Sequence, residues 1–218
     1  MAISPVFKEA TFEADEAFDV EDRPTARSES SAVSSGWAAA EALTTPSGDY
    51  PVDFKHSEQP QIVKFIDADG PFAIYKQHFL SGKEGKKSYV CLGANCPLCT
   101  ELNNKPEDKR AFTVVNLSAE PFQRQLLIAT PRLFKALHNI HFTPQGPLDK
   151  NFWAISRTGV KQTTLYNINS VKGRDLKEDW NIDEEAANEF LASVEPYDRS
   201  VIRETSFAEL LEIAKSLS

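Results

Sequence analysis

The three cysteines and one histidine of this chain have the types and the spacing of a metal site. The cysteines are Cys91, Cys96 and Cys99, and the last two form a Cys-Pro-Leu-Cys pair. Such a C-x-x-C turn brings two thiolates to one tetrahedral ion, and zinc prefers thiolate and imidazole ligands. His78 lies close upstream, in the run that precedes Cys91. We therefore predict a Cys₃His zinc site, which is structural because four protein ligands leave no position open for a substrate.

Three other interpretations of the cysteines remain open. A redox-active C-x-x-C pair of the thioredoxin type needs a strand-to-helix junction in a βαβ unit, and the surrounding pattern offers none. A disulfide would leave one odd thiol, and it suits an oxidising compartment, whereas we expect a reducing cytoplasm. Cysteines buried simply as apolar residues would not gather in one short segment. The metal site accounts for the clustering, and the other three interpretations do not.

The elements that must position these ligands are rich in β-structure. Between residues 61 and 171, β-branched and aromatic runs alternate with polar or glycine-containing turns. We expect strands at residues 61–67, 71–80, 87–93, 110–118, 124–130, 151–158 and 161–171. Thr130 and Pro131 have the types of an N-cap and a first helical residue, and they predict a helix that ends near Ile140. This order of elements favours a mainly β fold, a small barrel, over a βαβ sheet.

The two ends of the chain have a different composition from this centre. Residues 1–58 are expected to form an acidic, flexible arm and linker with one short helix at 36–43. Residues 59–175 are the expected basic domain, and residues 176–218 an acidic helical region. Within the last region we expect helices at 184–194 and 207–217. The apolar face of the final helix either packs on its own domain or docks on another protein, because periodicity does not identify the partner.

Charge is distributed unevenly along the chain. The net charge is −8, but residues 61–175 hold 16 Lys and Arg against 9 Asp and Glu, a net of +7. The segments on either side carry −8 and −7. A basic centre between acidic ends favours a polyanionic partner such as nucleic acid. The alternative is that the acidic ends only keep the protein soluble.

Basic and aromatic residues are interleaved in the centre, as a groove for single-stranded nucleic acid requires. The candidate contacts are Tyr75, Lys76, Lys86, Lys87, Tyr89, Lys109, Arg110, Phe112, Arg124, Trp153, Arg157, Lys161 and Tyr166. Any of the aromatic rings could instead belong to the core, as most phenylalanines do. No pattern of a major-groove recognition helix stands out, which favours single strands over duplex. The sequence does not decide between DNA and RNA.

The order His78, Cys91, Cys96, Cys99 in a basic β-rich domain resembles the zinc-containing, helix-destabilising single-stranded DNA-binding proteins of tailed phages. The stretch at 152–159, followed by 164–168, is similar to their closing hairpin. The resemblance covers roughly residues 60–172. It implies an OB-fold with an inserted zinc subdomain, and an acidic C-terminal region that recruits replication proteins and competes with DNA. The acidic N-terminal arm departs from the basic arm usual in that family.

The leading hypothesis is a non-enzymatic protein that coats single-stranded DNA in replication or recombination with little sequence preference. The alternative is a zinc-stapled adaptor that binds other proteins through its acidic ends. A metal-dependent hydrolase is disfavoured, because no open histidine-rich site, Ser-His-Asp set or phosphate-binding glycine loop is present. The first residues lack the pattern of a signal peptide, and no apolar run is long enough to span a membrane, so we expect a cytoplasmic protein.

Overall fold

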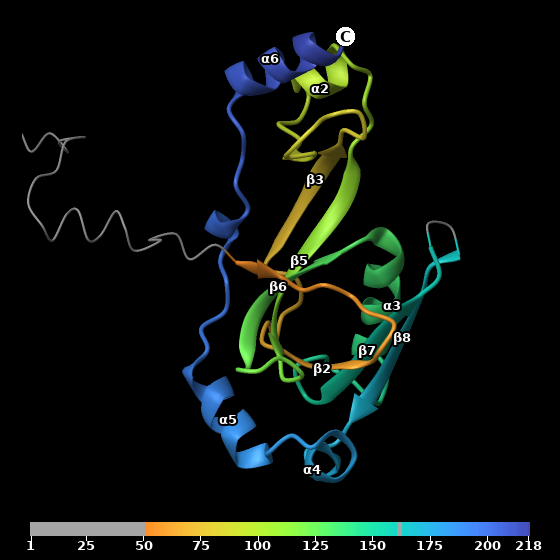
Figure 1. Cartoon of the computed structure of the whole chain (residues 1–218), viewed down its shortest axis with the longest axis vertical. Helices are drawn as coiled ribbons and strands as arrows, with labels where there is room; N and C mark the ends of the chain where they lie inside the picture. The colour runs from red at the N-terminus through yellow and green to blue at the C-terminus, as the bar shows by residue number, and fades with distance from the viewer. Residues whose placement is uncertain (1–50, 161–162) are drawn as a thin grey trace, which may run out of the picture. The chain divides into compact units, whose positions relative to one another are not determined.

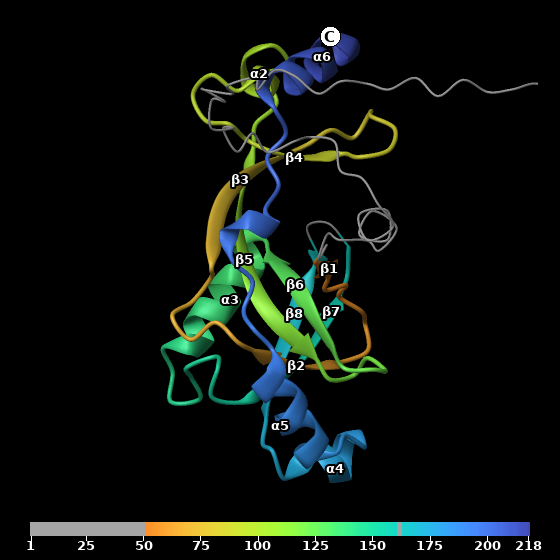
Figure 2. The same ribbon diagram turned by 90° about the vertical axis from the view of Figure 1, so that its left-hand side faces the viewer.

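The computed structural model describes residues 51–160 and 163–218, in which strands form one sheet with helices at its margins (Figures 1 and 2). Residues 49–218 form one compact unit. Most of the expected N-terminal arm, with its helix at 36–43, lies outside the described residues. Within them the fold is mainly β, as the sequence predicts.

Each of the seven expected runs contains a strand, and one short strand was not expected. The strands are β1 (Val52–Asp53), β2 (Gln61–Phe65), β3 (Ala73–Phe79), β4 (Ser88–Val90), β5 (Glu107–Asn116), β6 (Gln123–Ala129), β7 (Phe152–Thr158) and β8 (Leu165–Val171). β5 begins three residues earlier than its apolar pattern indicates, because its polar first residues pair with β3. The sequence missed β1 because it is only two residues long and follows a proline-containing segment.

The long strand β5 organises the sheet. β6 runs antiparallel along one edge of β5, while β3 and β2 share the other edge, β3 along its first half and β2 along its second. β2 also pairs with β7, and β7 forms a hairpin with β8. The hairpin turns at Gly159, where φ is +74° and a Cβ would lie 2.3 Å from the carbonyl oxygen of Thr163. Only glycine fits this turn.

The sheet is open, because its order ends at β1 beside β6 on one side and at β8 on the other. A bridging segment, residues 54–57, follows β1 and crosses between these two ends. Its first backbone N–H, that of Phe54, donates to Leu126 of β6 at 2.9 Å. At its other end, the Ser57 carbonyl accepts the N–H of Arg157 in β7 at 2.8 Å. The segment therefore links β6 to β7, the strands next to the two ends of the sheet.

One face of the sheet, here called the inner face, carries Val63, Phe112 and Trp153 and packs against α3 (Pro131–His141), which Figure 1 shows beside the strands. The helix starts where the sequence predicts, and the Thr130 side chain accepts a hydrogen bond from the N–H of Leu133. Leu133 and Leu137 are fully buried. They pack in the main core with Phe54, Val63, Phe65, Phe112, Val114, Leu127, Ala129, Leu148, Trp153 and Ile155.

The acidic C-terminal region covers the outer face of the sheet. α4 (Asp175–Trp180), which the sequence did not predict, and α5 (Glu184–Ser193) pack through Leu176 and Ala187 on a second core. The expected cap of α5 is present, since the Asp183 side chain accepts from the N–H of Ala186. These buried contacts show that the acidic region is part of the same packed unit as the sheet.

Residues 194–206 form a strap that runs from α5 to the last helix, α6 (Phe207–Leu217) (Figure 2). Tyr197 of the strap is buried against β5 and β6, and its N–H donates to the Thr113 hydroxyl at 2.9 Å. α6 starts with the expected capping box of Ser206 and Glu209. None of the helices within 51–160 and 163–218 combines the length and the apolar character needed to cross a lipid bilayer.

Candidate metal centre and candidate nucleic-acid interface

Strand register brings His78 and Cys91 to one place. In the β3–β4 pair His78 lies opposite Tyr89, so their side chains share a face of the ladder. Cys91 comes two residues after Tyr89 and returns to that face, because side chains alternate along a strand. The N–H of Cys91 donates to the carbonyl of Lys76 at 2.8 Å, which extends the pairing by one residue. The predicted proximity of His78 and Cys91 is confirmed.

Cys96 and Cys99 lie on a single helical turn, α2 (Pro97–Thr100). Cys96 is its N-cap residue, and its carbonyl accepts the N–H of Cys99 at 2.9 Å. Pro97 occupies the first helical position, where its fixed φ suits the turn and its missing N–H costs nothing. This tight turn places both thiols on the same side of the chain.

The four side chains converge with the spacing of a tetrahedral metal site. His78 Nε2 lies 3.4 Å from the Cys96 sulfur and 3.5 Å from that of Cys99, and the sulfurs of Cys91 and Cys99 are 3.7 Å apart. Bond lengths of zinc imply tetrahedral edges of about 3.8 Å between sulfurs and about 3.6 Å between sulfur and nitrogen. The three cysteines form no disulfide. The four residues could hold a metal ion, and no other such group occurs in the described part of the chain.

Asn104 holds the imidazole of His78 in place. Its Oδ1 lies 2.9 Å from His78 Nδ1, while its Nδ2 donates to the carbonyl of Phe79 at 3.2 Å. The second hydrogen bond fixes which end of the amide faces the ring, so Nδ1 is the protonated nitrogen. Nε2 is then left with its lone pair directed at the three sulfurs. Partners of this kind orient metal-binding histidines and set their tautomer.

The thiols need a cation before all three can ionise. Burial and the neighbouring sulfurs of Cys91 and Cys96 raise the pKa of Cys99 to about 11. Burial also opposes ionisation of Cys96, but backbone N–H groups, among them those of Leu98 and Cys99, lower its pKa overall. A site with one favoured thiolate and one strongly disfavoured thiolate suits a divalent ion, which converts like-charge repulsion into attraction.

The metal module, residues 78–104, has its own small core, and α6 completes it. Leu98 and Cys96 are fully buried together with Leu210 and Ala214 of α6. Figure 1 shows α6 lying on α2 at the far end of β3 and β5. Of the two possibilities that the sequence left open for the last helix, packing on its own domain is the one observed.

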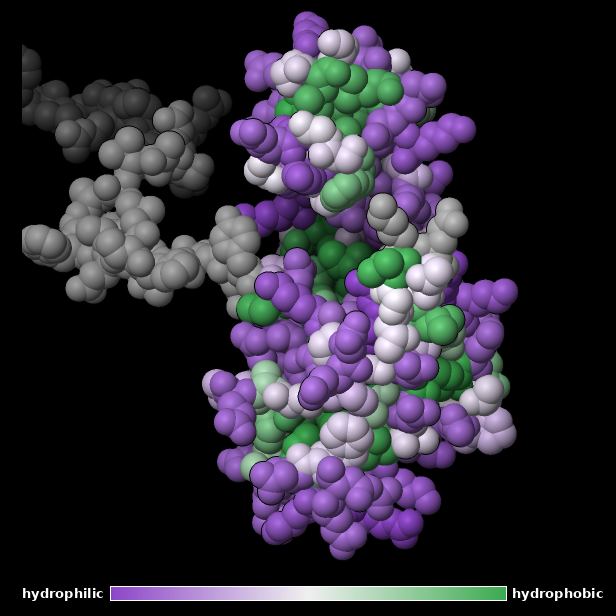
Figure 3. Space-filling view, turned by 45° about the vertical axis from the view of Figure 1, so that its right-hand side comes forward, coloured by the Kyte–Doolittle hydropathy of each residue, from purple (hydrophilic) through white to green (hydrophobic). Residues whose placement is uncertain are grey.

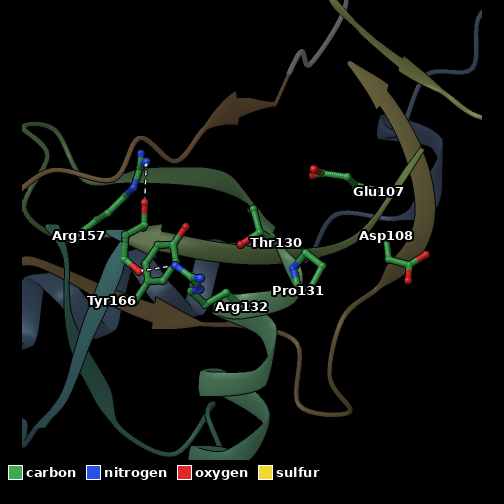
Figure 4. A pocket seen from close by; sticks show the side chains of 8 residues that line it. Glu107, Asp108, Thr130, Pro131, Arg132, Arg157 and Tyr166 are labelled. Carbon is green, nitrogen blue, oxygen red and sulfur yellow. Dashed lines mark hydrogen bonds between the residues drawn. The ribbon is translucent and has the colours of Figure 1, made fainter. Parts of the chain in front are cut away.

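A cleft of about 440 Å³ lies between the start of β5, the start of α3 and the β7–β8 hairpin. Figure 4 shows Arg132, Arg157 and Tyr166 on one side of it and Glu107 on the other. Thr164 ties the two arginines together. Its carbonyl accepts from Arg132 Nη1 at 2.9 Å, and its hydroxyl lies 3.5 Å from Arg157 Nη2.

This arrangement brings two positively charged side chains to one wall of the cleft. Arg157 Nε is buried and has no hydrogen-bond partner. Nearby, burial and the charge of Arg157 lower the pKa of His56 to about 4, so its imidazole is neutral at pH 7 and the arginines carry the charge. Like charges on one wall repel each other, and an anion bound beside them reduces that repulsion. Figure 3 shows the surface hollowed below the end that carries the four candidate metal ligands, with hydrophobic residues at the floor of the hollow.

Three of the aromatic candidates are buried, which corrects the expectation that their rings stack on bases. Phe112 and Trp153 belong to the main core, and Trp153 donates its Nε1–H to the Leu148 carbonyl at 2.6 Å. Tyr89 is buried in the metal module, where Lys86 Nζ lies 5.0 Å from the centre of its ring. A buried ring cannot stack on a base unless the core around it opens.

Two further candidates are covered by the strap. The Arg124 guanidinium lies over the ring of Tyr197, at 4.3 Å, and donates to the Glu195 carbonyl at 3.0 Å. Tyr75 packs in the same cluster, and burial raises its pKa to about 12. Both residues hold the C-terminal region on the outer face of the sheet.

The remaining candidates fall into three groups. Arg157 and Tyr166 line the cleft. Lys109 and Arg110 form ion pairs with Glu107 and Asp108, at 2.8 and 3.9 Å. The exposed candidates are Lys76, Lys86 and Lys87, while Lys161 lies outside the described residues.

Sequence reasoning missed Arg132 and Thr164, which complete the basic wall of the cleft. The available signal for Arg132 was its place directly after Thr130 and Pro131, since side chains at the start of a helix stand beside the end of the preceding strand. Thr164 gave no signal, because its role depends on the hairpin bringing it to α3. Comparison of the chain with protein-family models, curated proteins and solved structures found no match.

Proposed function

We propose that this protein binds single-stranded DNA, with the cleft as the part of its surface that receives the strand. The observation that carries the proposal is Arg157, whose Nε is buried and unpartnered, held beside Arg132 by hydrogen bonds of both side chains to Thr164. Guanidinium groups bind phosphate through parallel N–H donors, and an anion there would satisfy the orphan donor. Tyr166 lies beside them, half-buried against His56 and the main core, and the part of its ring that lines the cleft could contact a base.

The dimensions of the cleft favour a single strand over a duplex. A volume of about 440 Å³ is in the range of sites for one small molecule, and a nucleotide is of that size. A duplex major groove would need a protruding helix or ribbon, whereas the start of α3 lies inside the cleft. The exposed lysines of β3 and of the β3–β4 loop, Lys76, Lys86 and Lys87, would extend the positive track along the backbone of the strand.

An OB-type barrel is the architecture that we infer for the sheet. The order of elements matches the five strands and one helix of that fold if β2 and β3 are counted as its first strand, followed by β5, β6, α3, β7 and β8. As in that fold, the first strand pairs with the fourth, here β2 with β7. In place of direct pairing between β6 and β8, the bridging segment closes the gap. In this reading the metal module is an insertion in the first loop, and the β7–β8 turn is the last loop. These are the loops that flank the oligonucleotide site of OB-folds.

We infer that the ion is zinc and that its role is structural. The donor distances match tetrahedral zinc, and three thiolates with one imidazole are a common structural set. His78 and Cys96 are fully buried and Cys91 and Cys99 are half-buried, and four protein donors leave no open position on a tetrahedral ion. The ion would hold the two strands, α2 and α6 as one module beside the cleft.

We further infer that the acidic C-terminal region docks replication proteins. The exposed side chains at the start of α5 include Glu184, Glu185 and Glu189, and together they present a negative face away from the cleft. The alternative function, a zinc-stapled adaptor, would use this face alone.

The deciding experiment measures binding of a fluorescently labelled oligo-deoxythymidine as a function of salt. A label is used because, of the tryptophans in the described residues, Trp153 is buried and Trp180 is half-buried. Log affinity should fall linearly with log salt, at a slope near −0.7 per phosphate contact. Arg157→Ala should weaken binding and make the slope shallower by about one contact.

The matched control is Arg174→Ala, because Arg174 is 77% exposed just before α4 and away from the cleft. It should leave both affinity and slope unchanged. Absence of measurable binding by the folded wild-type protein at low salt would reject the proposal in favour of the adaptor. Equal losses of DNA affinity in Arg157→Ala and Arg174→Ala would show that net charge, and not the cleft, governs binding.

A further inference from the structure

The wall of the cleft opposite the two arginines carries a carboxylate. Figure 4 shows the side chain of Glu107 directed into the cleft, toward Thr130, whereas the carboxylate of Asp108 points away. Lys109 Nζ lies 2.8 Å from Oε2 of Glu107, which restrains the position of the carboxylate. The Glu107 side chain is nevertheless 67% exposed and accessible to a ligand.

The two walls of the cleft recognise different groups, an anion on one side and a hydrogen-bond donor on the other. The arginines bind an anion, while an ionised carboxylate accepts hydrogen bonds and offers none. One nucleotide carries both complements if its base has an exocyclic amino group. Cytosine presents such a donor at N4, where thymine and uracil present a carbonyl oxygen at O4. An oxygen facing Glu107 would leave two acceptors in contact without a hydrogen between them.

From this opposition we infer that the cleft prefers a cytosine-type edge to a thymine-type edge, and that Glu107 is the residue that determines the preference. The inference rests on the proposed function. The phosphate binds Arg132 and Arg157, the ring stacks on Tyr166, and the N4 amino group donates to Glu107. A low overall sequence preference is compatible with it, because only the nucleotide in the cleft is read and the rest of the strand is bound through its backbone.

Comparison of the two pyrimidines isolates the contribution of Glu107. Cytosine and thymine are both single-ring bases on the same backbone, so phosphate contacts are shared, and the bases differ in their hydrogen-bonding edge and in the methyl group of thymine, which uracil lacks. A hydrogen bond between a carboxylate and cytosine N4, set against repulsion by thymine O4, changes affinity by about tenfold. The preference should apply to uracil as to thymine, because both carry O4.

The test compares labelled oligo-deoxycytidine with labelled oligo-deoxythymidine of equal length on the full chain. Wild-type protein should bind the cytidine oligomer about tenfold more tightly. In Glu107→Gln the ratio of the two affinities should fall toward one, because an amide can both donate and accept. Loss of a negative charge will strengthen binding of both oligomers, but the ratio is insensitive to that general effect.

Glu120→Gln makes the same charge change in the exposed β5–β6 turn, at the opposite end of β5 from Glu107, and it should keep the wild-type ratio. A wild-type ratio near one would overturn the inference, and so would a ratio unchanged in Glu107→Gln. Both results would leave single-strand binding itself intact. Absence of binding to either oligomer would instead reject the proposed function together with the preference.

Discussion

Asn104→Ala offers a direct test of how the metal centre is built. The substitution removes the 2.9 Å hydrogen bond to His78 Nδ1 and the 3.2 Å hydrogen bond to the Phe79 carbonyl. His78 is fully buried, so its N–H would lose its partner without gaining water, at a cost of about 1–3 kcal/mol. That range corresponds to the roughly 10–100-fold loss in metal affinity that follows removal of such a partner. We expect zinc to bind Asn104→Ala about 10–100-fold more weakly, with the fold retained at saturating metal.

Competition against a chromophoric chelator measures this affinity, and cobalt absorption reports whether the ligand set stays tetrahedral. Asn104→Asp should bind nearly as tightly as the wild type, because a carboxylate still accepts from Nδ1. Asn139→Ala, at an exposed position of α3, is the matched control and should have no effect. Wild-type affinity in Asn104→Ala would refute the argument that His78 depends on Asn104 for its orientation.

Three further predictions concern the metal, the core and pH. Cys96→Ser should lower both zinc content and melting temperature. Hydrogen exchange should also become faster in α6, because α6 packs on the metal module. Full stability of the metal-free protein would contradict the assignment. Trp153→Ala should cost about 3–5 kcal/mol in the free energy of unfolding measured by urea, because the ring is fully buried, whereas a stacking role would weaken only DNA binding. For Asp67, burial raises the pKa from 3.8 to about 6, against hydrogen bonds from Thr113 that lower it. The stability that its protonated form contributes is therefore present below pH 3.8 and is lost as pH rises through 6. Between pH 4 and pH 7, the free energy of unfolding of Asp67→Asn should rise by about 1–2 kcal/mol relative to that of the wild type, after allowance for partial solvent screening. Urea unfolding of both proteins at each pH measures this difference. The contribution of His56 to the pH dependence is the same in both proteins and cancels. A difference in free energy that stays constant with pH would contradict the prediction.

Short-range patterns in the sequence were sufficient for the metal cluster and for most element boundaries. The three cysteines lie on one turn and one strand end, and His78 reaches them across a short hairpin. Few alternative geometries are compatible with such close spacing. The helix caps at Thr130, Asp183 and Ser206 are local for the same reason, because each cap bonds an N–H only a few residues away.

What the tertiary structure alone decided was which face of each strand is covered. Period-two alternation along β7 puts Trp153 and Arg157 on one face, but it does not show that Trp153 is buried while Arg157 lines the cleft. The outer face that carries Tyr75 and Arg124 looked available, yet Tyr197, far along the chain, lies on it. The basic wall of the cleft likewise depends on a helix and a hairpin that meet only in the folded chain. Alternation is a property of a single strand, whereas exposure depends on every segment that packs against it, and those segments are distant in sequence.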